Sequence, residues 1–386
     1  MTHSISIFSF PTRVIFGAGA LVELDTEIRR FEMRHPFLVT DSGVARAGHV
    51  ERVKAAAGNV ALAVFEGVSP NPTEANILDG LEHYRLENCD GIIALGGGSP
   101  LDAAKVIRLA VTHPLPLEQY DDQGDGSSRI NNNLPPLIAI PTTSGTGSEV
   151  GRSAVIVLKA TDRKTVIFSP HLIPNVALDD PELTIAMPPA ITAGTGLDAL
   201  THNVEAYLAT GYHPMCDAIA LSGTRLAVQN LAAAVHRGRD LGARSNMMMA
   251  SMMGAVAFQK GLGVVHSLAH PLSSIGGLHH GTTNGVLLPY VMEFNRPTCE
   301  ERIRDLALTM DLDVAREPVS RAATAAIERV RELLREIGVP DRLSQLGIKR
   351  AMIPALSKKA VEDACHLSNP RPCTEADMVR LYELAF

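Results

Sequence analysis

The first half of the chain alternates short apolar runs with segments of helical pattern, which is typical of a parallel sheet covered by helices. We predict strands over residues 37–40, 91–95 and 137–140, and a further strand over residues 153–158. The second and third of these runs lead directly into turns rich in Gly, Ser and Thr. Because parallel sheets bind ligands at the carboxyl ends of their strands, these turns are candidates for a binding site.

The pattern changes near residue 183, where strand-like runs become scarce and long segments rich in Ala, Leu and Met take over. Residues 219–235 and 322–337 are two such segments. We therefore predict the fold class α/β plus all-α, with an α/β domain over residues 1–182 and an all-helical domain over residues 183–386. The length of 386 residues also favours two domains over one.

Composition and charge narrow the class of partner. The chain is 46% hydrophobic and 20% charged with a net charge of −7, which disfavours a wide basic surface for nucleic acid or an anionic membrane. Its five cysteines are odd in number and show no CxxC spacing, so reduced thiols fit better than a disulfide framework. We expect a small-molecule ligand, no nucleic-acid or membrane partner, and a cytoplasmic location.

Neither the N-terminus nor the most apolar window predicts export or membrane insertion. The opening MTHSISIFSF has no basic region followed by an apolar stretch, so we identify no signal peptide. Residues 247–258 are too few to span a bilayer, and we interpret them as a buried helix.

The strongest phosphate-binding candidate is the segment Gly-Gly-Gly-Ser-Pro at residues 96–100, directly after a predicted strand. Three glycines leave backbone N–H groups bare, Ser99 can cap the next helix, and Pro100 suits its first position. The positive end of that helix would hold a pyrophosphate. Asp102 and Lys105 fall in its first turns. A glycine-rich turn without a ligand is the alternative interpretation.

Three other segments bear on nucleotide binding. Residues 141–149, Pro-Thr-Thr-Ser-Gly-Thr-Gly-Ser-Glu, supply hydroxyls and flexible backbone after another predicted strand, and two such turns favour a dinucleotide. Residues 17–22 fail as a G-x-G-x-x-G motif because Val22 stands where the third glycine should be, so we interpret them as a tight turn. Asp41 ends a predicted strand, where a carboxylate can bind ribose hydroxyls and repel a 2′-phosphate. A solvated turn aspartate is the alternative.

A second constellation lies in the helical half of the chain. Asp198 and His202 are four residues apart, which places both on one face of a helix, and His266 and His270 repeat this spacing. His280 follows after a glycine-rich bend. One carboxylate with three imidazoles suits Fe²⁺ or Zn²⁺ rather than Ca²⁺ or Mg²⁺. The spacing does not decide which three of the histidines bind.

Taken together, these motifs resemble the iron-containing (group III) alcohol dehydrogenase family. The segments that carry the resemblance span almost the whole chain: residues 16–19, 96–99, 141–149, 196–207, 261–281, 369–371 and 381–386. The resemblance implies an N-terminal Rossmann-like domain that binds the dinucleotide and a C-terminal helical domain that binds the metal, with the active site in the cleft between them. It also implies that Asp198, His202, His266 and His280 are the iron ligands, and that His270 lies beside the metal.

The resemblance further implies which residues surround the dinucleotide. They are Asp41, Asn71, Gly97, Gly98, Ser99, Thr142, Thr143, Thr146 and Lys164, to which we add Asp102 from the helix after the glycines. The expected cofactors are therefore NAD(H) and Fe²⁺, with Zn²⁺ as the alternative metal. We expect a homodimer or a larger homo-oligomer.

Two segments depart from the commonest pattern of the family. Arg152 and its preceding glycine stand where many relatives have a threonine, and the segment ending at Lys260 stands where many carry a small polar residue or asparagine. Both segments should border the substrate, so either cation is a candidate partner for an anionic group of a short substrate. The alternative is structural: Lys260 lies outside the pocket, and Arg152 pairs with Glu149 or Asp162.

We therefore expect an NAD(H)-dependent oxidoreductase that interconverts a short-chain primary alcohol or diol and its aldehyde. Fe²⁺ would polarise the substrate oxygen, and His270 is the candidate for proton transfer. A dehydroquinate-synthase-like lyase would have to hold a phosphorylated sugar acid, but no Lys/Arg cluster surrounds the metal motifs. The intact Asp/His/His/His set argues against a metal-free reductase of the maleylacetate type. A non-catalytic regulator that binds metal or nucleotide would show no turnover on a broad alcohol panel.

Overall fold

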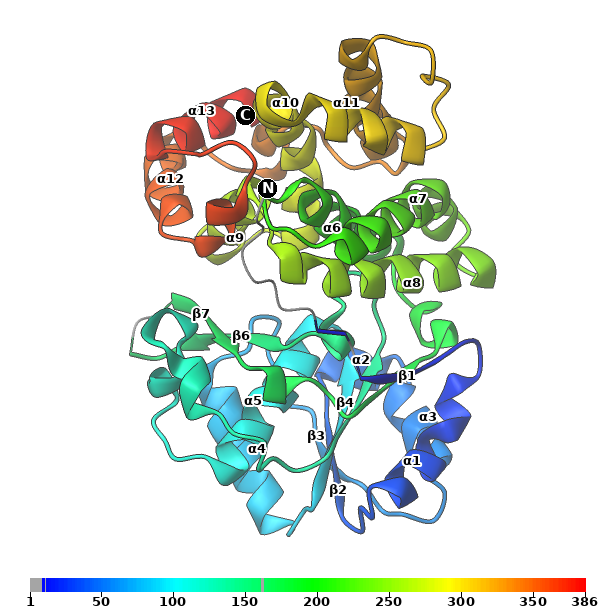
Figure 1. Cartoon of the computed structure of the whole chain (residues 1–386). Helices are drawn as coiled ribbons and strands as arrows, with labels where there is room; N and C mark the ends of the chain where they lie inside the picture. Colours follow the sequence, from blue (N-terminus) through cyan, green and yellow to red (C-terminus); the bar gives the residue numbers. More distant parts are fainter. Residues whose placement is uncertain (1–8, 11, 161–162) are drawn as a thin grey trace. The chain divides into compact units, whose positions relative to one another are not determined.

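The computed structural model describes residues 9–10, 12–160 and 163–386, which form two compact units. The α/β unit comprises Phe10–Thr143 and Gly147–Ala186, and the helical unit comprises Met187–Phe386 together with Ser9 and Ser144–Thr146 (Figure 1). The predicted fold class is confirmed, because one unit holds the parallel sheet and the other is helical. Most of the N-terminal segment in which no signal peptide is identified lies outside the described residues.

The α/β unit is built on a six-stranded, wholly parallel sheet with the strand order β1-β8-β5-β4-β2-β3. Its strands are β1 (Arg13–Phe16), β2 (Pro36–Val39), β3 (Ala63–Phe65), β4 (Gly91–Gly96), β5 (Leu137–Pro141) and β8 (Val176–Asp179). The predicted strand over residues 153–158 is present, but it lies outside this sheet. It is β6 (Ser153–Leu158), which pairs with β7 (Arg163–Phe168) in a separate antiparallel ribbon.

Helices cover both faces of the six-stranded sheet. Successive side chains of a strand point to opposite faces, so each strand packs against both layers of helices. In β2, Phe37 and Val39 pack with the apolar residues of α4 and α5, whereas Leu38 packs with those of α1 and α3. Strands buried on both faces appear in the sequence as uninterrupted apolar runs, which is why they are predictable. The helices of this unit are α1 (Leu24–Arg30), α2 (Ser42–Arg46), α3 (His49–Ala56), α4 (Glu74–Leu86) and α5 (Gly98–Thr112).

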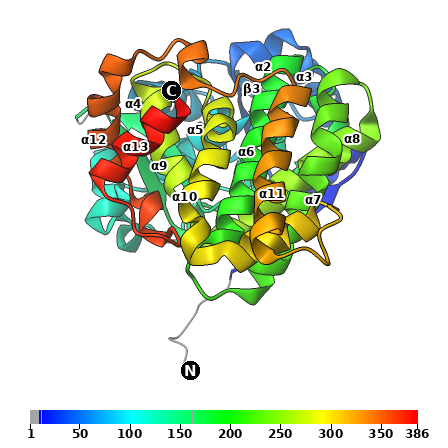
Figure 2. The same ribbon diagram turned by 90° about the horizontal axis from the view of Figure 1, so that it is seen from above.

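The helical unit has one apolar core, to which all of its long helices contribute. Figure 2 shows these helices from above. Its centre is α6, which is buried along most of its length and packs against α7, α8 and α10. The predicted helical segment 219–235 falls within α7, and the predicted segment 322–337 extends one residue beyond the end of α11. The helices are α6 (Pro189–Leu208), α7 (Pro214–His236), α8 (Leu241–Ala257), α9 (Val264–Ser274), α10 (His280–Thr309, kinked at Cys299), α11 (Val319–Glu336), α12 (Ile353–Val361) and α13 (Glu375–Ala385).

One helix of the described chain, α7, is long and apolar enough to cross a membrane by length and composition alone. The pair α8–α9 meets the same criterion only if it is taken as one span despite a bend of 113°. α7 packs against α6 and α8 and contributes to the core of the helical unit, as a core helix of a folded domain does.

Candidate functional site

Asp198 and His202 lie one turn apart on α6, and both are buried. The start of α10 comes very close to this helix. A Cβ atom on Gly281 would stand 2.0 Å from the carbonyl oxygen of Gly194 and 2.8 Å from Cβ of Asp198, so only glycine fits there. This close approach brings His280, the first residue of α10, to the acidic side chain of α6.

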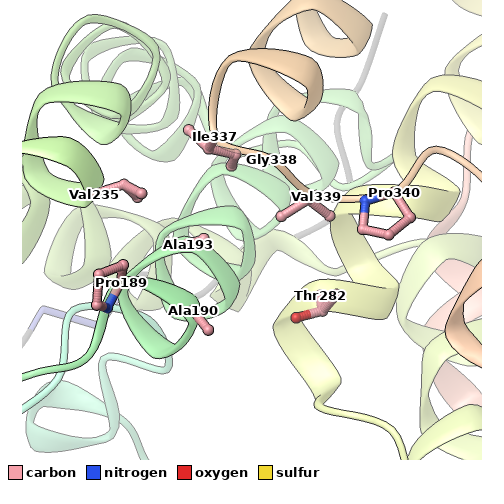
Figure 3. A pocket seen from close by; sticks show the side chains of 9 residues that line it. All are labelled: Pro189, Ala190, Ala193, Val235, Thr282, Ile337, Gly338, Val339 and Pro340. Atoms are coloured by element: carbon pink, nitrogen blue, oxygen red, sulfur yellow. The ribbon is translucent and has the colours of Figure 1, made fainter.

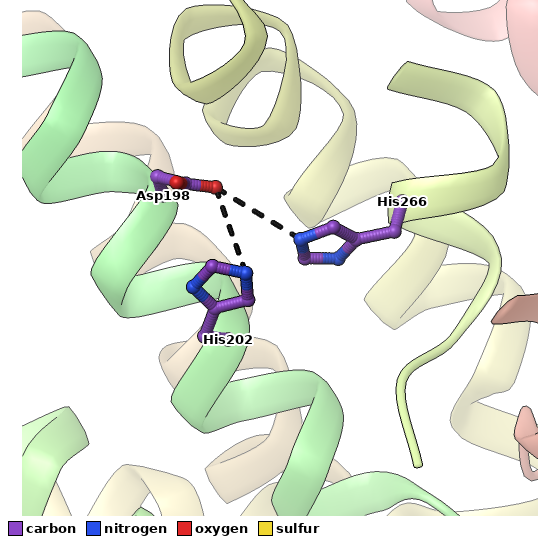
Figure 4. A group of neighbouring side chains, drawn as sticks. All are labelled: Asp198, His202 and His266. Atoms are coloured by element: carbon purple, nitrogen blue, oxygen red, sulfur yellow. Dashed lines mark ion pairs between the residues drawn. The ribbon is translucent and has the colours of Figure 1, made fainter. Parts of the chain in front are cut away.

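Three imidazoles converge on one carboxylate oxygen. The Nε2 atoms of His202 and His266 each lie 3.9 Å from Oδ1 of Asp198, and Nε2 of His280 lies 3.6 Å from the same atom. Figure 4 shows His202 on α6 and His266 on α9 facing Asp198. Asp198, His202 and His266 are fully enclosed, whereas the side chain of His280 is 29% exposed. The site is therefore closed on the side of α6 and α9 and open beside His280.

The Nδ1 atoms of two imidazoles have fixed partners on their far sides. Nδ1 of His202 lies 3.3 Å from the carbonyl oxygen of Gly145, and Nδ1 of His266 lies 2.5 Å from Oε2 of Glu205. Because both partners are acceptors, each Nδ1 carries the hydrogen. Each Nε2 therefore presents a lone pair towards Asp198, which is the state that a metal ligand requires.

The charges of the site keep Asp198 ionised and act differently on the imidazoles of His202 and His266. Burial opposes ionisation of Asp198, but the nearby His202, His280 and His266 outweigh it and lower the pKa of Asp198 to about 2. Burial lowers the pKa of His202 to about 4. Burial also opposes the charged form of His266, but the Glu205 hydrogen bond and the surrounding carboxylates raise its pKa. The site thus favours positive charge at its centre.

The amide of Asn284 completes the inner surface of the cluster. Its Nδ2 donates to Oδ1 of Asp198 at 2.7 Å and lies 3.1 Å from Nε2 of His280. Within the described chain, the buried Oδ1 of Asn284 has no hydrogen-bond partner. Lone pairs of nitrogen and oxygen that face one another at the centre of a buried cluster suit a cation. A donor set of three nitrogens and one oxygen therefore fits a borderline divalent ion such as Fe²⁺ or Zn²⁺.

His270 lies beside this cluster rather than within it. Its ring stacks on that of His280 at 5.1 Å between centroids, with an interplanar angle of 14°. Its Nδ1 lies 2.7 Å from Oδ2 of Asp363, whose other oxygen accepts from Ser267 Oγ and Cys365 N. These bonds hold the imidazole with its Nε2 directed away from Asp363.

In the α/β unit, the predicted phosphate-binding turn stands at the carboxyl end of β4 and the start of α5. Gly97 is the N-cap of α5. Because glycine has no side chain to cap the helix, the first N–H groups of α5 have no side-chain capping partner. A Cβ atom on Gly97 would stand 3.2 Å from the side chain of Thr143. The turns after β4 and β5 thus lie side by side, as two halves of one binding surface would.

The predicted cap by Ser99 is wrong. Because α5 begins at Gly98, Ser99 lies inside the first turn, and its hydroxyl donates instead to the carbonyl oxygen of Pro70 at 2.5 Å. Pro100 accordingly takes the third helical position rather than the first. The hydroxyl of Ser99 fixes the loop before α4 to the glycine-rich turn, which is a long-range contact that helix-capping rules do not contain.

The other predicted nucleotide residues occupy different surroundings. Asp41 is the N-cap of α2, where Oδ1 accepts from the N–H groups of Gly43 and Val44 at 2.7 and 2.9 Å. Asn71 is exposed, Thr142 is buried after β5, and Lys164 lies half-buried on β7. Thr146 belongs to the short segment that groups with the helical unit.

Asp102 lies in a buried network. Its carboxylate accepts from Ser148 Oγ at 2.6 Å and from Val155 N at 3.0 Å, and Lys105 donates to the same serine oxygen at 2.8 Å. Burial lowers the pKa of Lys105 to about 8, although Asp102 and Glu149 oppose the shift. These bonds join α5 to β6 and to the segment that precedes it.

Two family models divide the chain much as the two units do. The iron-containing alcohol dehydrogenase model matches residues 11–181, and the model of the C-terminal part of the Fe-containing alcohol dehydrogenase family matches residues 192–386. The chain belongs to the iron-containing alcohol dehydrogenase family. The predicted family is thereby confirmed, and the chain is an enzyme of the dehydrogenase and reductase type.

Individual members of the family match over nearly their whole length. The 4-hydroxybutyrate dehydrogenase of Cupriavidus necator is 41% identical, covering 96% of this chain and 97% of its own. The crystal structure of a 1,3-propanediol oxidoreductase aligns with a TM-score of 0.95 at 37% identity, covering 99% of this chain and 100% of its own. A sulfoacetaldehyde reductase from Bifidobacterium kashiwanohense, solved in complex with NAD⁺, aligns at 0.89 with 27% identity over 99% of both chains.

Three residues without a place in the predicted motifs contact the Asp198 and histidine cluster of this alcohol dehydrogenase or lie beside it. Asn284 lies four residues after His280, and Glu205 lies three residues after His202, so helical spacing contains a signal for both. Asp363 lies 93 residues after His270 and only tertiary structure brings it there.

The two candidate substrate cations of this enzyme have different surroundings. Lys260 is buried, and its ammonium group donates to Asp217 at 2.5 Å and to the carbonyl oxygen of Tyr207 at 2.8 Å. Arg152 lies over the ring of Phe168, 5.3 Å from the ring centroid, while Asp162 lies outside the described residues. The structural alternative therefore fits Lys260.

The helical unit also contains an apolar pocket of about 320 Å³ at the start of α6 (Figure 3). None of the predicted site residues lines it. The lining residues are Pro189, Ala190, Ala193, Val235, Thr282, Ile337, Gly338, Val339 and Pro340.

Proposed function

We propose that this enzyme interconverts a short-chain primary alcohol or diol and the corresponding aldehyde. A divalent ion, Fe²⁺ or alternatively Zn²⁺, is bound by Asp198, His202, His266 and His280, and NAD(H) carries the hydride. The single observation that carries the proposal is the convergence of three imidazole Nε2 atoms within 3.6–3.9 Å of Oδ1 of Asp198.

The relatives support the same reaction class. By their names, they act on 4-hydroxybutyrate, 1,3-propanediol and sulfoacetaldehyde, and each of these names denotes an alcohol or aldehyde at the end of a short chain. Two of the three compounds also carry an anionic group at the far end. A substrate panel should therefore include both a neutral diol and an ω-hydroxy acid.

The ion, when bound, supplies a Lewis acid that polarises the substrate oxygen. In our proposal, the side chains of this enzyme admit the substrate and transfer the proton. The open side of the cluster beside His280 admits the substrate, since the other ligands are enclosed. His270 is the candidate for proton transfer, because Asp363 holds its Nδ1 and leaves Nε2 to exchange a proton with substrate or water.

In the α/β unit, we propose that the bare N–H groups at the start of α5 bind the pyrophosphate of NAD(H). Gly97, Gly98, Thr142 and Thr143 form the surface around it, and Ser99 holds the turn in shape. Asp41 uses only Oδ1 to cap α2, so Oδ2 is left for the ribose hydroxyls. Asn71, Asp102 and Lys164, together with Thr146 of the segment 144–146, complete the proposed set.

The test separates metal binding from turnover. Enzyme purified and loaded with Fe²⁺ without oxygen should oxidise members of the alcohol panel, followed by NADH absorbance. His266→Ala should lose both metal and activity while NADH binding, measured by fluorescence, remains. Full activity of a metal-free preparation would contradict the proposal.

A matched pair of variants tests the assignment within the adjacent histidines 279 and 280. His279 caps α10 through Thr282 N, and His279→Asn can keep that cap, so it should retain metal and activity. His280→Ala should lose both. If the two variants behave alike, His280 is not a ligand.

A further inference from the structure

We propose that Glu205 is the positioning residue that fixes the tautomer of His266 and supplies the second negative charge of the metal centre. This inference rests on the proposed function, because it assumes that Asp198 and the three histidines bind a divalent ion.

Glu205 joins the two helices that carry the buried ligands. It lies on α6, seven residues after Asp198, and its side chain is only 4% exposed. Both carboxylate oxygens bind the first turn of α9: Oε2 lies 2.5 Å from Nδ1 of His266, and Oε1 accepts from Val265 N at 2.7 Å. A single carboxylate thus holds both the backbone and the imidazole of the ligand-bearing turn.

The backbone of α9 makes room for this contact. Gly263 is the N-cap of the helix, and a Cβ atom there would stand 2.6 Å from Oε1 of Glu205. A larger residue at 263 would displace the carboxylate. The glycine that precedes the ligand turn therefore serves the carboxylate that orients the ligand.

The chemistry of a carboxylate determines the tautomer. An ionised carboxylate accepts hydrogen bonds and cannot donate, so Nδ1 of His266 must carry the hydrogen. Nε2 is then a lone pair, and it faces Asp198 at 3.9 Å. If the hydrogen moved to Nε2, it would point at the position of the ion and block coordination. Glu205 thereby selects the ligating tautomer before metal binds.

Charge balance gives Glu205 a second role. Among the ion pairs of the described chain, Glu205 pairs only with His266, and Asp198 pairs only with the three histidines. Two buried carboxylates require two positive charges in a site of low dielectric. A divalent ion supplies them, whereas a site with Asp198 alone would hold a net positive charge after metal binding.

The experiment compares two carboxylate–histidine pairs. In the first pair the histidine is a proposed metal ligand, and in the second it is not. Glu205→Gln keeps the size of the side chain but places an amide N–H group against either His266 Nδ1 or Val265 N, so one of the two contacts becomes donor against donor. Asp363→Asn makes the same chemical change behind His270, which we do not assign as a ligand. Apo-enzyme of each variant is titrated with Co²⁺, and the visible d–d absorption bands report the bound ion.

We expect Glu205→Gln to weaken Co²⁺ affinity by about 10- to 100-fold, the usual cost of losing a partner behind a metal ligand. Asp363→Asn should bind Co²⁺ like the wild type. Unchanged affinity in Glu205→Gln, while the wild type binds and His266→Ala does not, would overturn this inference and leave the proposed function intact. Failure of the wild type to bind Co²⁺ would instead overturn the proposed function.

A second measurement determines the tautomer of His266 in the wild-type enzyme, so it does not require that Glu205→Gln folds. In metal-free wild-type enzyme labelled with ¹⁵N-histidine, the His266 ring should show its proton on Nδ1, with the signal assigned by its loss in His266→Gln. A proton on Nε2 would overturn the inference.

Discussion

The role of the buried cation Lys260 can be tested quantitatively, because the lysine either stabilises the fold or recognises the substrate. Its side chain is 2% exposed, and its ammonium group holds Asp217 and the carbonyl oxygen of Tyr207 near the end of α6. In Lys260→Met these charge-assisted bonds are lost, at about 1.5–3 kcal/mol each before compensation. Asp217 keeps Arg302 at 2.9 Å, and methionine fills the apolar path of the lysine stem.

We therefore expect Lys260→Met to lower the free energy of unfolding by about 2 kcal/mol. Asp217→Asn leaves Lys260 without its anion, and removal of one partner of a buried pair costs about 3–5 kcal/mol. The asparagine variant should thus be the less stable of the two, and the double variant should lose less than the sum of both. Urea unfolding followed by circular dichroism of the helices measures all three.

The same variants decide the role of Lys260 in recognition. The ratio of kcat/KM for 4-hydroxybutyrate to that for 1,3-propanediol should be the same in Lys260→Met and in the wild type, since the lysine is committed to Asp217. A tenfold or greater fall in that ratio without loss of stability would refute the structural reasoning and return Lys260 to the substrate pocket.

Three further variants test other parts of the molecule. Asp41→Gly should relax the preference for NAD(H) over NADP(H) tenfold or more, about 1.4 kcal/mol, and cost only a few tenths of a kcal/mol as a lost cap; equal use of both cofactors by the wild type would contradict the assignment. Burial raises the pKa of Glu149 to about 7, so the wild type loses stability as the pH rises from about 4.5 to 7, because the unfolded chain ionises first. Glu149→Gln should remove that loss, and parallel stability curves for both proteins would count against it. Asp363→Asn should lower kcat about tenfold or more with unchanged metal content, because His270 loses its orientation; an unaltered kcat would leave His270 without a role.

The sequence predicts those site residues whose proximity to one another follows from local backbone geometry. Asp198 and His202 share a helix, and a helix converts a spacing of four residues into proximity, so their convergence is predictable. His280 is near them because glycines at 194 and 281 allow two helices to touch. That close approach is a property of packing, and the sequence indicates it only through the glycines themselves.

The residues that escape prediction are those whose partners are far along the chain. Glu205 has the right helical spacing, but a glutamate on a helix is most often solvated, and its burial depends on α9. Ser99 satisfies the rules for a cap, but α5 begins two residues earlier than predicted and the hydroxyl of Ser99 donates to Pro70 instead. The strands, in contrast, are predictable because both of their faces are buried.

The tripeptide Ser144–Thr146 connects the chemistry of the two units through the backbone. Thr143, on its N-terminal side, borders the glycine turn at the start of α5, while the carbonyl oxygen of Gly145 lies behind the imidazole of His202. A shift of this short segment would displace both Thr143 and the carbonyl group behind the imidazole of His202. By thermodynamic linkage, any factor by which the metal changes the affinity for nucleotide must equal the factor by which nucleotide changes the affinity for metal. If the cofactors bind as proposed, the threonine-rich turn is the covalent connection through which such a linkage would run.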